Sequence, residues 1–418
     1  MIRSRSRFWV TPVIAVIALV AFLAVVPAAS VAAAAGPVPA GSSVVVRDWE
    51  RIAISTIYGP PDQPVRTPIP VGVLYMGFTS LAMYRAAEAA DRQHGSPVAA
   101  IARAAHDVLA EYVPTQVDLA GAPADSLAGV PDGVAKRRGV DAGARVAHQL
   151  IASRAHDGRN DTSIVYQREP APGVWQPAPG GQMLVAWLGF VRSLVLTKPI
   201  RAAGVTGPDP LTSTAYAAQY NEVRVTGSAT ATPDERTPGQ TDTALFFNSN
   251  SAIMVSEALL RYLDTRPRSL SDTARLFAAI HTAMSDALIT CWRLKYDVGF
   301  WRPFQAIHGA DTDGNPATDP DPGWPPLIAN PPYSDYVSGH GCLTSPAVQT
   351  IRRLLGENTT LTLHSYNTKS DPTKPTLGTI EHDAVHARIW GGLHFRTAME
   401  DAYAIGHEAA NEILGKLH

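Results

Sequence analysis

Apolar residues recur at helical spacing in several separate stretches of the chain. Ser96-Pro97 provides an N-cap and a first-turn proline for the pattern that follows, which stops at Pro114. The longest pattern covers 271–296, where positions from Leu276 to Trp292 mark one buried stripe. Further helices are expected over 80–92, 141–154, 213–225, 240–247, 252–263 and 346–355. Because strand-like alternation is scarce, the sequence predicts an all-α fold of helical bundles joined by long ordered loops.

Three stretches lack a sustained period and are expected to be loops. Residues 36–80 mix proline, glycine and β-branched residues, so a loop with a short initial helix is expected there. Residues 159–211 are rich in proline, glycine and aromatic residues and are expected to form a long wrapping connection. Residues 308–337 are rich in proline, glycine and aspartate, which is typical of a solvated acidic loop.

The first 35 residues have the pattern of a secretory signal peptide. Arg3, Arg5 and Arg7 precede an apolar run from Trp9 to Val26, and small residues follow through residue 35. The sequence therefore predicts a secreted, extracellular protein with no stable membrane span after cleavage. The alternative is a retained membrane anchor, because the apolar run approaches spanning length.

Composition narrows the class of protein further. With 418 residues, 45% apolar and 17% charged, the chain is typical of a globular protein of one or two domains. Without the three arginines of residues 1–35, the formal net charge falls from −2 to about −5. A net negative charge of this size gives no indication of nucleic-acid binding, which usually requires a basic surface.

Three polar clusters follow one another in the C-terminal half, and the first is Lys295 with Arg302. Seven residues apart, they would share one helix face, but Gly299 and Pro303 indicate a helix end between them. Lysine offers a compact point charge, and arginine offers a planar fork for two oxygens. The alternative for this pair is an exposed basic helix end.

The second cluster is Ser338-Gly339-His340, just before an expected helix. A hydroxyl, an unhindered backbone N–H and a helix N-terminus together favour anion binding, and a histidine suits acid–base chemistry. The alternative is a capped turn with a surface histidine.

The third cluster contains Arg388 and His394, separated by Gly391-Gly392, where two helices can meet at an angle. Singly, these residues also fit a surface salt bridge and a core histidine. Taken together, the order and spacing of the three clusters favour one oxyanion site.

Cys291 and Cys342 lie beside the first and second clusters, so they should converge if the clusters do. Export permits a Cys291–Cys342 disulfide, and two buried free thiols are the alternative.

The pattern K-x6-R-P, S-G-H and R-x5-H resembles the superfamily of vanadium-dependent haloperoxidases and type 2 phosphatidic acid phosphatases. Residues 97–114, 131–158 and 236–247 also look like secreted bacterial haloperoxidase-like members. The resemblance implies a signal peptide over 1–35, an N-terminal helical half over 36–235 and a catalytic helical bundle over 236–418.

The resemblance also implies a role for each cluster. His394 would coordinate vanadium in a haloperoxidase, or attack phosphorus in a phosphatase, and His340 would be the acid–base partner. The anion's oxygens would be held by the remaining residues of the clusters: Lys295, Arg302, Ser338, Gly339 and Arg388. Trp292 matches an aromatic residue of chloroperoxidase-like members, but no halide preference follows.

One departure from the family concerns the residue that hydrogen-bonds to His394 and orients its ring. Family members usually carry an acid four residues after it, which holds the other ring nitrogen. Here that position is Ala398, and Asp401 is too far along the helix to replace it directly. Val337 and Ala387 are milder departures, at positions where the family commonly has proline and serine.

The leading interpretation is a vanadate-dependent haloperoxidase that uses hydrogen peroxide to oxidise halide, with a small organic substrate. The alternatives are a secreted acid phosphatase acting through a phosphohistidine at His394, and a non-catalytic oxyanion-binding protein. The sequence leaves open whether the chain forms a homo-oligomer.

Overall fold

The computed structural model describes residues 42–60, 66–114, 119, 121–371, 373–374 and 376–417. The expected signal peptide at 1–35 lies outside the described residues. Pro37–His418 form one compact unit, and the division at residue 235 stays a prediction.

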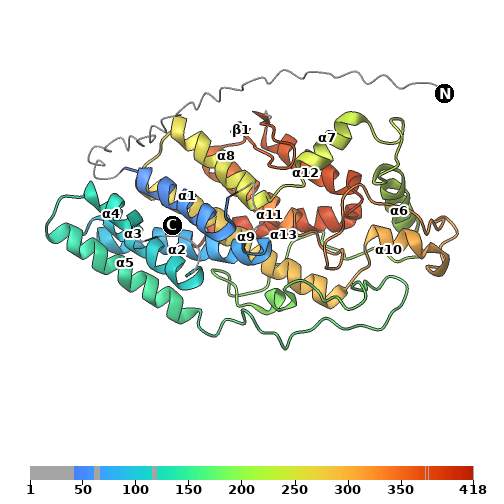
Figure 1. Ribbon diagram of the computed structural model, residues 1–418, viewed down its shortest axis with the longest axis horizontal. Coiled ribbons are helices and arrows are strands. Elements are labelled where there is room, and N and C mark those ends of the chain that lie inside the picture. Colours follow the sequence, from blue (N-terminus) through green and yellow to red (C-terminus); the bar gives the residue numbers. More distant parts are fainter. Residues whose placement is uncertain are drawn as a thin grey trace, which may run out of the picture. The chain divides into compact units, whose positions relative to one another are not determined.

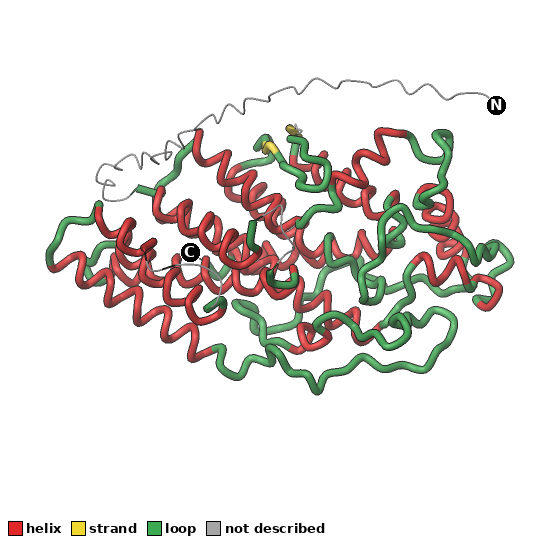
Figure 2. The backbone as a smooth tube through the Cα atoms, viewed as in Figure 1, coloured by secondary structure: helices red, strands yellow, loops and turns green. Residues whose placement is uncertain are grey.

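The described residues are mostly helical, which confirms the all-α prediction (Figures 1 and 2). One two-stranded antiparallel ribbon, β1 (Leu361–Thr362) with β2 (Thr373–Lys374), is the exception among named elements. None of the helices in this described part is both long and apolar enough to span a membrane. The α-helices are α1 (Val44–Tyr58), α2 (Ile69–Arg92), α3 (Pro97–Tyr112), α4 (Gly121–Ala128), α5 (Val134–Ser153), α6 (Thr214–Thr226), α7 (Pro238–Phe246), α8 (Ser251–Thr265), α9 (Leu270–Val298), α10 (Pro303–His308), α11 (Gly341–Leu355), α12 (Leu377–Trp390) and α13 (Arg396–Leu414), and the 3-10 helices are η1 (Ala186–Phe190) and η2 (Ala310–Thr312).

The 29-residue helix α9 is the element against which both ends of the chain pack. It contacts α2, α11, α13 and η1, and its apolar stripe is buried as expected. Ser269 caps its start, and Gly299 ends it in a left-handed conformation at φ +59°. A Cβ at Gly299 would lie 2.3 Å from the Tyr166 hydroxyl oxygen, so only glycine fits this helix end.

The expectation of a loop over 36–80 was wrong for most of its length. Helix α1 occupies Val44–Tyr58, and α2 begins at Ile69. The buried side chains of α1 include Val46, Trp49 and Ile57, which have helical spacing despite the β-branched residues among them. Burial of that face outweighs the weak helix propensity of valine and isoleucine.

The wrapping connection expected over 159–211 is present as a loop interrupted by η1 (Figure 2). It holds the segment after α9 in place, because Trp175 N–H donates to Gly299 O at 2.8 Å and Trp301 N–H donates to Gly173 O at 2.9 Å. This pairing fixes the chain between Lys295 and Arg302.

Candidate active site

The three clusters predicted from the sequence converge into one buried site. Lys295 comes from the last turns of α9, and Arg302 directly precedes α10. Ser338-Gly339-His340 leads into α11, and Arg388 lies near the end of α12. His394 lies in the turn between α12 and α13, where a left-handed Gly392 (φ +73°) packs against the Gly227 carbonyl. All of these side chains are fully buried except that of His340, which is half-buried.

Backbone carbonyls hold the first two cations. Lys295 Nζ donates to Ser334 O at 2.8 Å and Asp335 O at 2.9 Å. Arg302 Nε donates to Tyr333 O and its Nη1 to Leu393 O, both at 2.8 Å. Carbonyls of residues 333–335, which precede the S-G-H cluster, thus hold both groups, and the Leu393 carbonyl also ties Arg302 to the segment of His394.

The third cation, Arg388, is anchored by a different element. Its Nη1 donates to Asn248 Oδ1 at 3.1 Å, just after α7. Burial lowers the pKa of Arg388 to about 9 and the pKa of Lys295 to about 8. Burial is the largest cause of both shifts, because removing a cation from water disfavours its charged form, and the nearby charge of Arg302 adds to it.

His394 is held on both sides of its ring. Nδ1 lies 2.8 Å from Asp335 Oδ1, and Nε2 lies 3.3 Å from Arg302 Nη1. Burial first, and then the charges of Arg302 and Lys295, lower the pKa of His394 well below its usual range. The ring is therefore neutral, with Nδ1–H donating to the carboxylate and the lone pair of Nε2 facing the cations.

Asp335 supplies the carboxylate that the family's usual position, now Ala398, lacks. Asp335 was not among the predicted site residues, although it stands only three residues before Ser338. Burial raises the pKa of Asp335 to about 7, while Arg302 and Lys295 oppose that rise. Asp401 is engaged elsewhere, because it accepts from Tyr336 OH at 2.6 Å. Ala398 contributes only its carbonyl, which accepts from Ser338 N–H at 2.9 Å.

Tyr333 is a second site residue to which the sequence assigned no role. Its ring centroid lies 4.9 Å from both Lys295 Nζ and Arg302 Cζ and 5.0 Å from the Trp292 ring centroid. Burial raises the pKa of Tyr333, so the phenol is neutral. The aromatic face stabilises the two cations without neutralising them.

His340 faces the same cations from the start of α11. Burial first, then the charge of Arg388, lowers its pKa well below its usual range, and a hydrogen bond with the Ser249 backbone opposes the shift. His340 is therefore a neutral imidazole beside three positive groups. Such a ring can accept a proton from a bound ligand.

Several donors in the site have no acceptor among the described residues. Arg302 Nη2 and Arg388 Nε are buried and unpaired, and the Gly339 N–H forms none of the hydrogen bonds found in this part of the chain. A Cβ at Gly339 would lie 3.1 Å from the Trp292 ring, so glycine leaves room beside the amide. Unpaired buried donors next to unpaired positive charge fit a tetrahedral oxyanion such as vanadate or phosphate.

The two cysteines converge as expected, and of the two alternatives left open by the sequence they are free thiols and not a disulfide. Cys291 and Cys342 are free buried thiols that hydrogen-bond to one another. The Cys291 thiol also donates to Val337 O at 3.2 Å. The pair thus packs behind the S-G-H segment as hydrogen-bonded thiols.

Comparison with known proteins finds similarity in sequence and in fold. Residues 275–418 match the family model described as the VCPO second helical-bundle domain. The vanadium chloroperoxidase of Curvularia inaequalis is 37% identical over 93 residues, which are 20% of this chain and 15% of that relative's length.

Solved structures match over much more of the chain, at low sequence identity. The crystal structure of the first bacterial vanadium-dependent iodoperoxidase superposes with a TM-score of 0.69 at 17% identity, covering 90% of this chain and 97% of that one. A holo-type bacterial vanadium-dependent chloroperoxidase gives 0.63 at 18% identity, covering 87% and 94%. Residues 275–418 are thus similar in sequence to a second helical-bundle domain of the VCPO type, and most of the chain shares the fold of these solved structures.

Proposed function

We propose that this protein is a vanadate-dependent haloperoxidase that oxidises halide with hydrogen peroxide. The observation that carries the proposal is the set of three buried cations, Lys295, Arg302 and Arg388, around the unprotonated Nε2 of His394. Buried charge without a counter-charge is costly, so the site favours an anion. The names of the relatives, which are vanadium chloroperoxidases and an iodoperoxidase, support vanadate as that anion.

Each residue of the site has a proposed part in holding the anion. His394 Nε2 would be the vanadium ligand, and its ring is kept in that tautomer by Asp335. The unpaired N–H groups of Arg302 and Arg388 would donate to the anion's oxygens, with Lys295 as a point charge. The Gly339 amide would add a donor.

Ser338 would donate its hydroxyl hydrogen to the same anion. Its Oγ accepts from Gly341 N–H at 3.3 Å, which leaves the hydroxyl hydrogen for the ligand.

Bound vanadate would supply a Lewis-acid centre that activates peroxide toward halide. His340 is the proposed proton acceptor and donor for that reaction, because it is neutral and lies in the same site. Burial keeps bulk water from competing with the substrate for these groups.

The same donors would also suit a phosphoryl group, with His394 as nucleophile. One pair of assays separates the two functions. Purified protein, with and without orthovanadate, is tested for peroxide-dependent oxidation of iodide, bromide and chloride, and for hydrolysis of a phosphate monoester. We expect vanadate-dependent halide oxidation.

If the protein hydrolyses the phosphate monoester, vanadate inhibits that hydrolysis and no halide is oxidised, the protein is a phosphatase and the proposal is wrong. The absence of both activities and of vanadate binding would leave a non-catalytic oxyanion-binding protein. His394→Ala should abolish the activity, and His364→Ala, at a partly exposed histidine paired with Asp371, is the matched control.

A further inference from the structure

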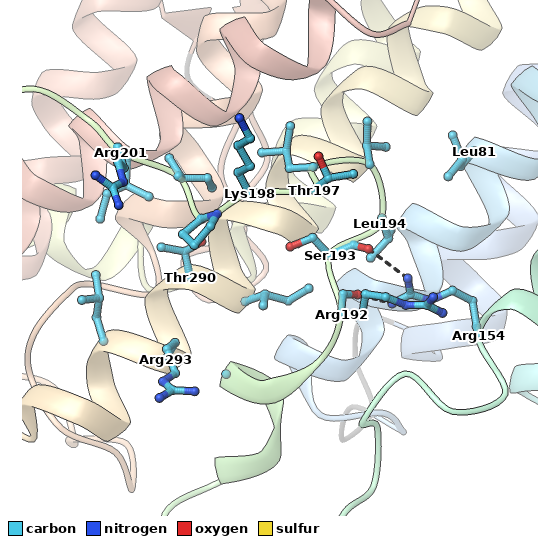
Figure 3. A pocket seen from close by; sticks show the side chains of 18 of the residues that line it. Leu81, Arg154, Arg192, Ser193, Leu194, Thr197, Lys198, Arg201, Thr290 and Arg293 are labelled. Carbon is cyan, nitrogen blue, oxygen red and sulfur yellow. Dashed lines mark hydrogen bonds between the residues drawn. The ribbon is translucent and has the colours of Figure 1, made fainter.

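A cavity of about 990 Å³ lies between the wrapping connection and the helices α2, α5 and α9 (Figure 3). The segment 192–205 of the connection forms one side of it. Ile405 of α13 contributes to the wall. The cavity volume is at the upper end of the range for small-molecule sites, roughly 300–1,000 Å³.

Much of the cavity wall is apolar. Leu81 and Leu150 are buried at the wall, whereas Leu194, Val205 and Leu294 are only half-buried and keep apolar surface toward the cavity. An extended hydrocarbon chain would cover that surface and remove it from water.

The charged residues that line the cavity are all basic, and no aspartate or glutamate is among them. Arg154 is paired with Asp157, and Arg293 with Asp297. Arg192, Lys198 and Arg201 are exposed and take part in no ion pair within the described part of the chain. Figure 3 shows Lys198, Arg201 and Arg293 spread around the pocket rather than gathered at one point.

The lining segment is fixed from below by a buried carboxylate. Asp286 accepts the backbone N–H groups of Leu194, Val195 and Leu196 at 2.5, 3.0 and 2.9 Å. Arg154 Nη1 donates to Ser193 O at 3.0 Å, and Figure 3 shows a hydrogen bond from the Arg154 guanidinium to this segment as a dashed line. The wall is therefore ordered before any ligand binds, which reduces the entropy cost of binding.

Helix α9 separates this cavity from the oxyanion site. Successive helical residues rotate by about 100°, so Ile289, Thr290, Arg293 and Leu294 of the cavity lie on one face. Trp292 and Lys295 of the oxyanion site lie on the opposite face. The cavity is thus a separate site and not an approach to the cations around His394.

We propose that this cavity binds a single-chain amphiphilic anion, namely a long-chain carboxylate. Its hydrocarbon chain would lie along the apolar wall beneath residues 192–205. Its carboxylate would meet the guanidinium of Arg201, and Lys198 and Arg192 elsewhere on the lining would add to the positive potential of a cavity that no acidic residue lines. The site requires both features, because the wall alone would not select an anion and the exposed cations alone would bind one only weakly.

Calorimetric titration of the purified protein with laurate, below its micelle concentration, tests the proposal. We expect saturable binding at one site, with at least tenfold weaker binding of butyrate and of dodecyltrimethylammonium. Arg201→Glu should weaken laurate binding at least tenfold. Arg268→Glu, a charge reversal at an exposed arginine away from the cavity lining, should leave it unchanged.

Several outcomes would overturn the proposal. These are no saturable laurate binding, equal affinity for dodecyltrimethylammonium, or equal loss in both arginine variants. Binding of anionic vesicles without binding of monomeric laurate would assign the face to membranes, and a dimer that Arg201→Glu dissociates would assign it to a second copy. His394→Ala should bind laurate normally, so failure of the oxyanion site and failure of this site are distinguishable.

Discussion

Replacing Asp335 by asparagine should disturb the oxyanion site through the tautomer of His394. The carboxylate accepts from His394 Nδ1–H through Oδ1 at 2.8 Å, and its Oδ2 has no hydrogen-bond partner among the described residues. An amide replaces one of these two acceptor oxygens by an NH2 group, which can only donate. If the amide nitrogen turns toward the ring, it donates to Nδ1 and moves the ring proton to Nε2. The lone pair that would hold the vanadate is then lost.

The geometry sets the expected size of the effect. Both partners are almost completely buried, with side-chain exposures of 2% for His394 and 1% for Asp335. A hydrogen bond to a charged group contributes about 1.5–3 kcal/mol. Orienting groups behind a metal-binding histidine typically change metal affinity by about 10–100-fold. We therefore expect Asp335→Asn to weaken vanadate binding about 10–100-fold.

Vanadate affinity, measured by calorimetric titration, is the direct assay. Nitrogen-15 chemical shifts of His394 report independently which ring nitrogen carries the proton. Asp401→Asn is the matched control, because Asp401 is also a buried carboxylate in this region but accepts from Tyr336 OH. That variant should lose stability without changing the His394 tautomer.

A second variant tests whether a carboxylate at the family's usual position can substitute. Ala398 and Asp335 line the same small space behind His394. Asp335→Asn/Ala398→Asp should therefore recover part of the vanadate affinity. Unchanged affinity and tautomer in Asp335→Asn alone would refute the proposed role of Asp335.

Three further predictions concern one anion contact and two stability effects. Arg302→Lys should weaken vanadate binding by roughly tenfold or more, because lysine cannot replace the guanidinium's several directed donors. Burial raises the pKa of Glu50, which lies beside His281, to about 8 from 4.5. The folded protein therefore binds the Glu50 proton more tightly than the unfolded chain does. The contribution of this proton to the free energy of unfolding is full below about pH 4.5 and is lost as pH rises through about 8. Glu50→Gln should accordingly gain stability relative to the parent between pH 5 and pH 8, by on the order of a few kcal/mol. Gly299→Ala should lower the free energy of unfolding by about 1–3 kcal/mol, because φ is +59° and Tyr166 blocks the added Cβ.

Each of these has a measurement that can contradict it. Vanadate titration of Arg302→Lys with parental affinity would show that the guanidinium fork is not used. Urea unfolding at pH 5 and pH 8 tests Glu50→Gln, and a constant difference between the two chains would rule out the raised pKa. Urea unfolding also tests Gly299→Ala, where parental stability would mean that the helix end tolerates a side chain.

The sequence by itself determined most of the helices and the identity of the cluster residues. Helix caps such as Ser96 and the apolar stripe of α9 are local signals, and they predicted α3 and α9 closely. The spacing of Lys295 and Arg302 around Gly299 likewise follows from local chemistry, since glycine ends the helix in a left-handed turn. Such features depend on neighbours within a few residues, which a single sequence contains.

Only the tertiary structure decided which groups steady the site. Asp335 contacts His394 although 59 residues separate them in the sequence. The backbone hydrogen bond from Trp175 to Gly299 helps to position Arg302, and Trp175 lies in the wrapping connection, whose sequence has no helical or strand periodicity. The two cysteines converge as predicted, yet remain thiols. A short initial helix was expected over 36–80, but α1 has 15 residues and α2 already begins at Ile69, because the β-branched residues there conceal buried helical faces. These outcomes depend on burial and on long-range contacts, whose energies outweigh local propensity and leave no regular spacing in the sequence.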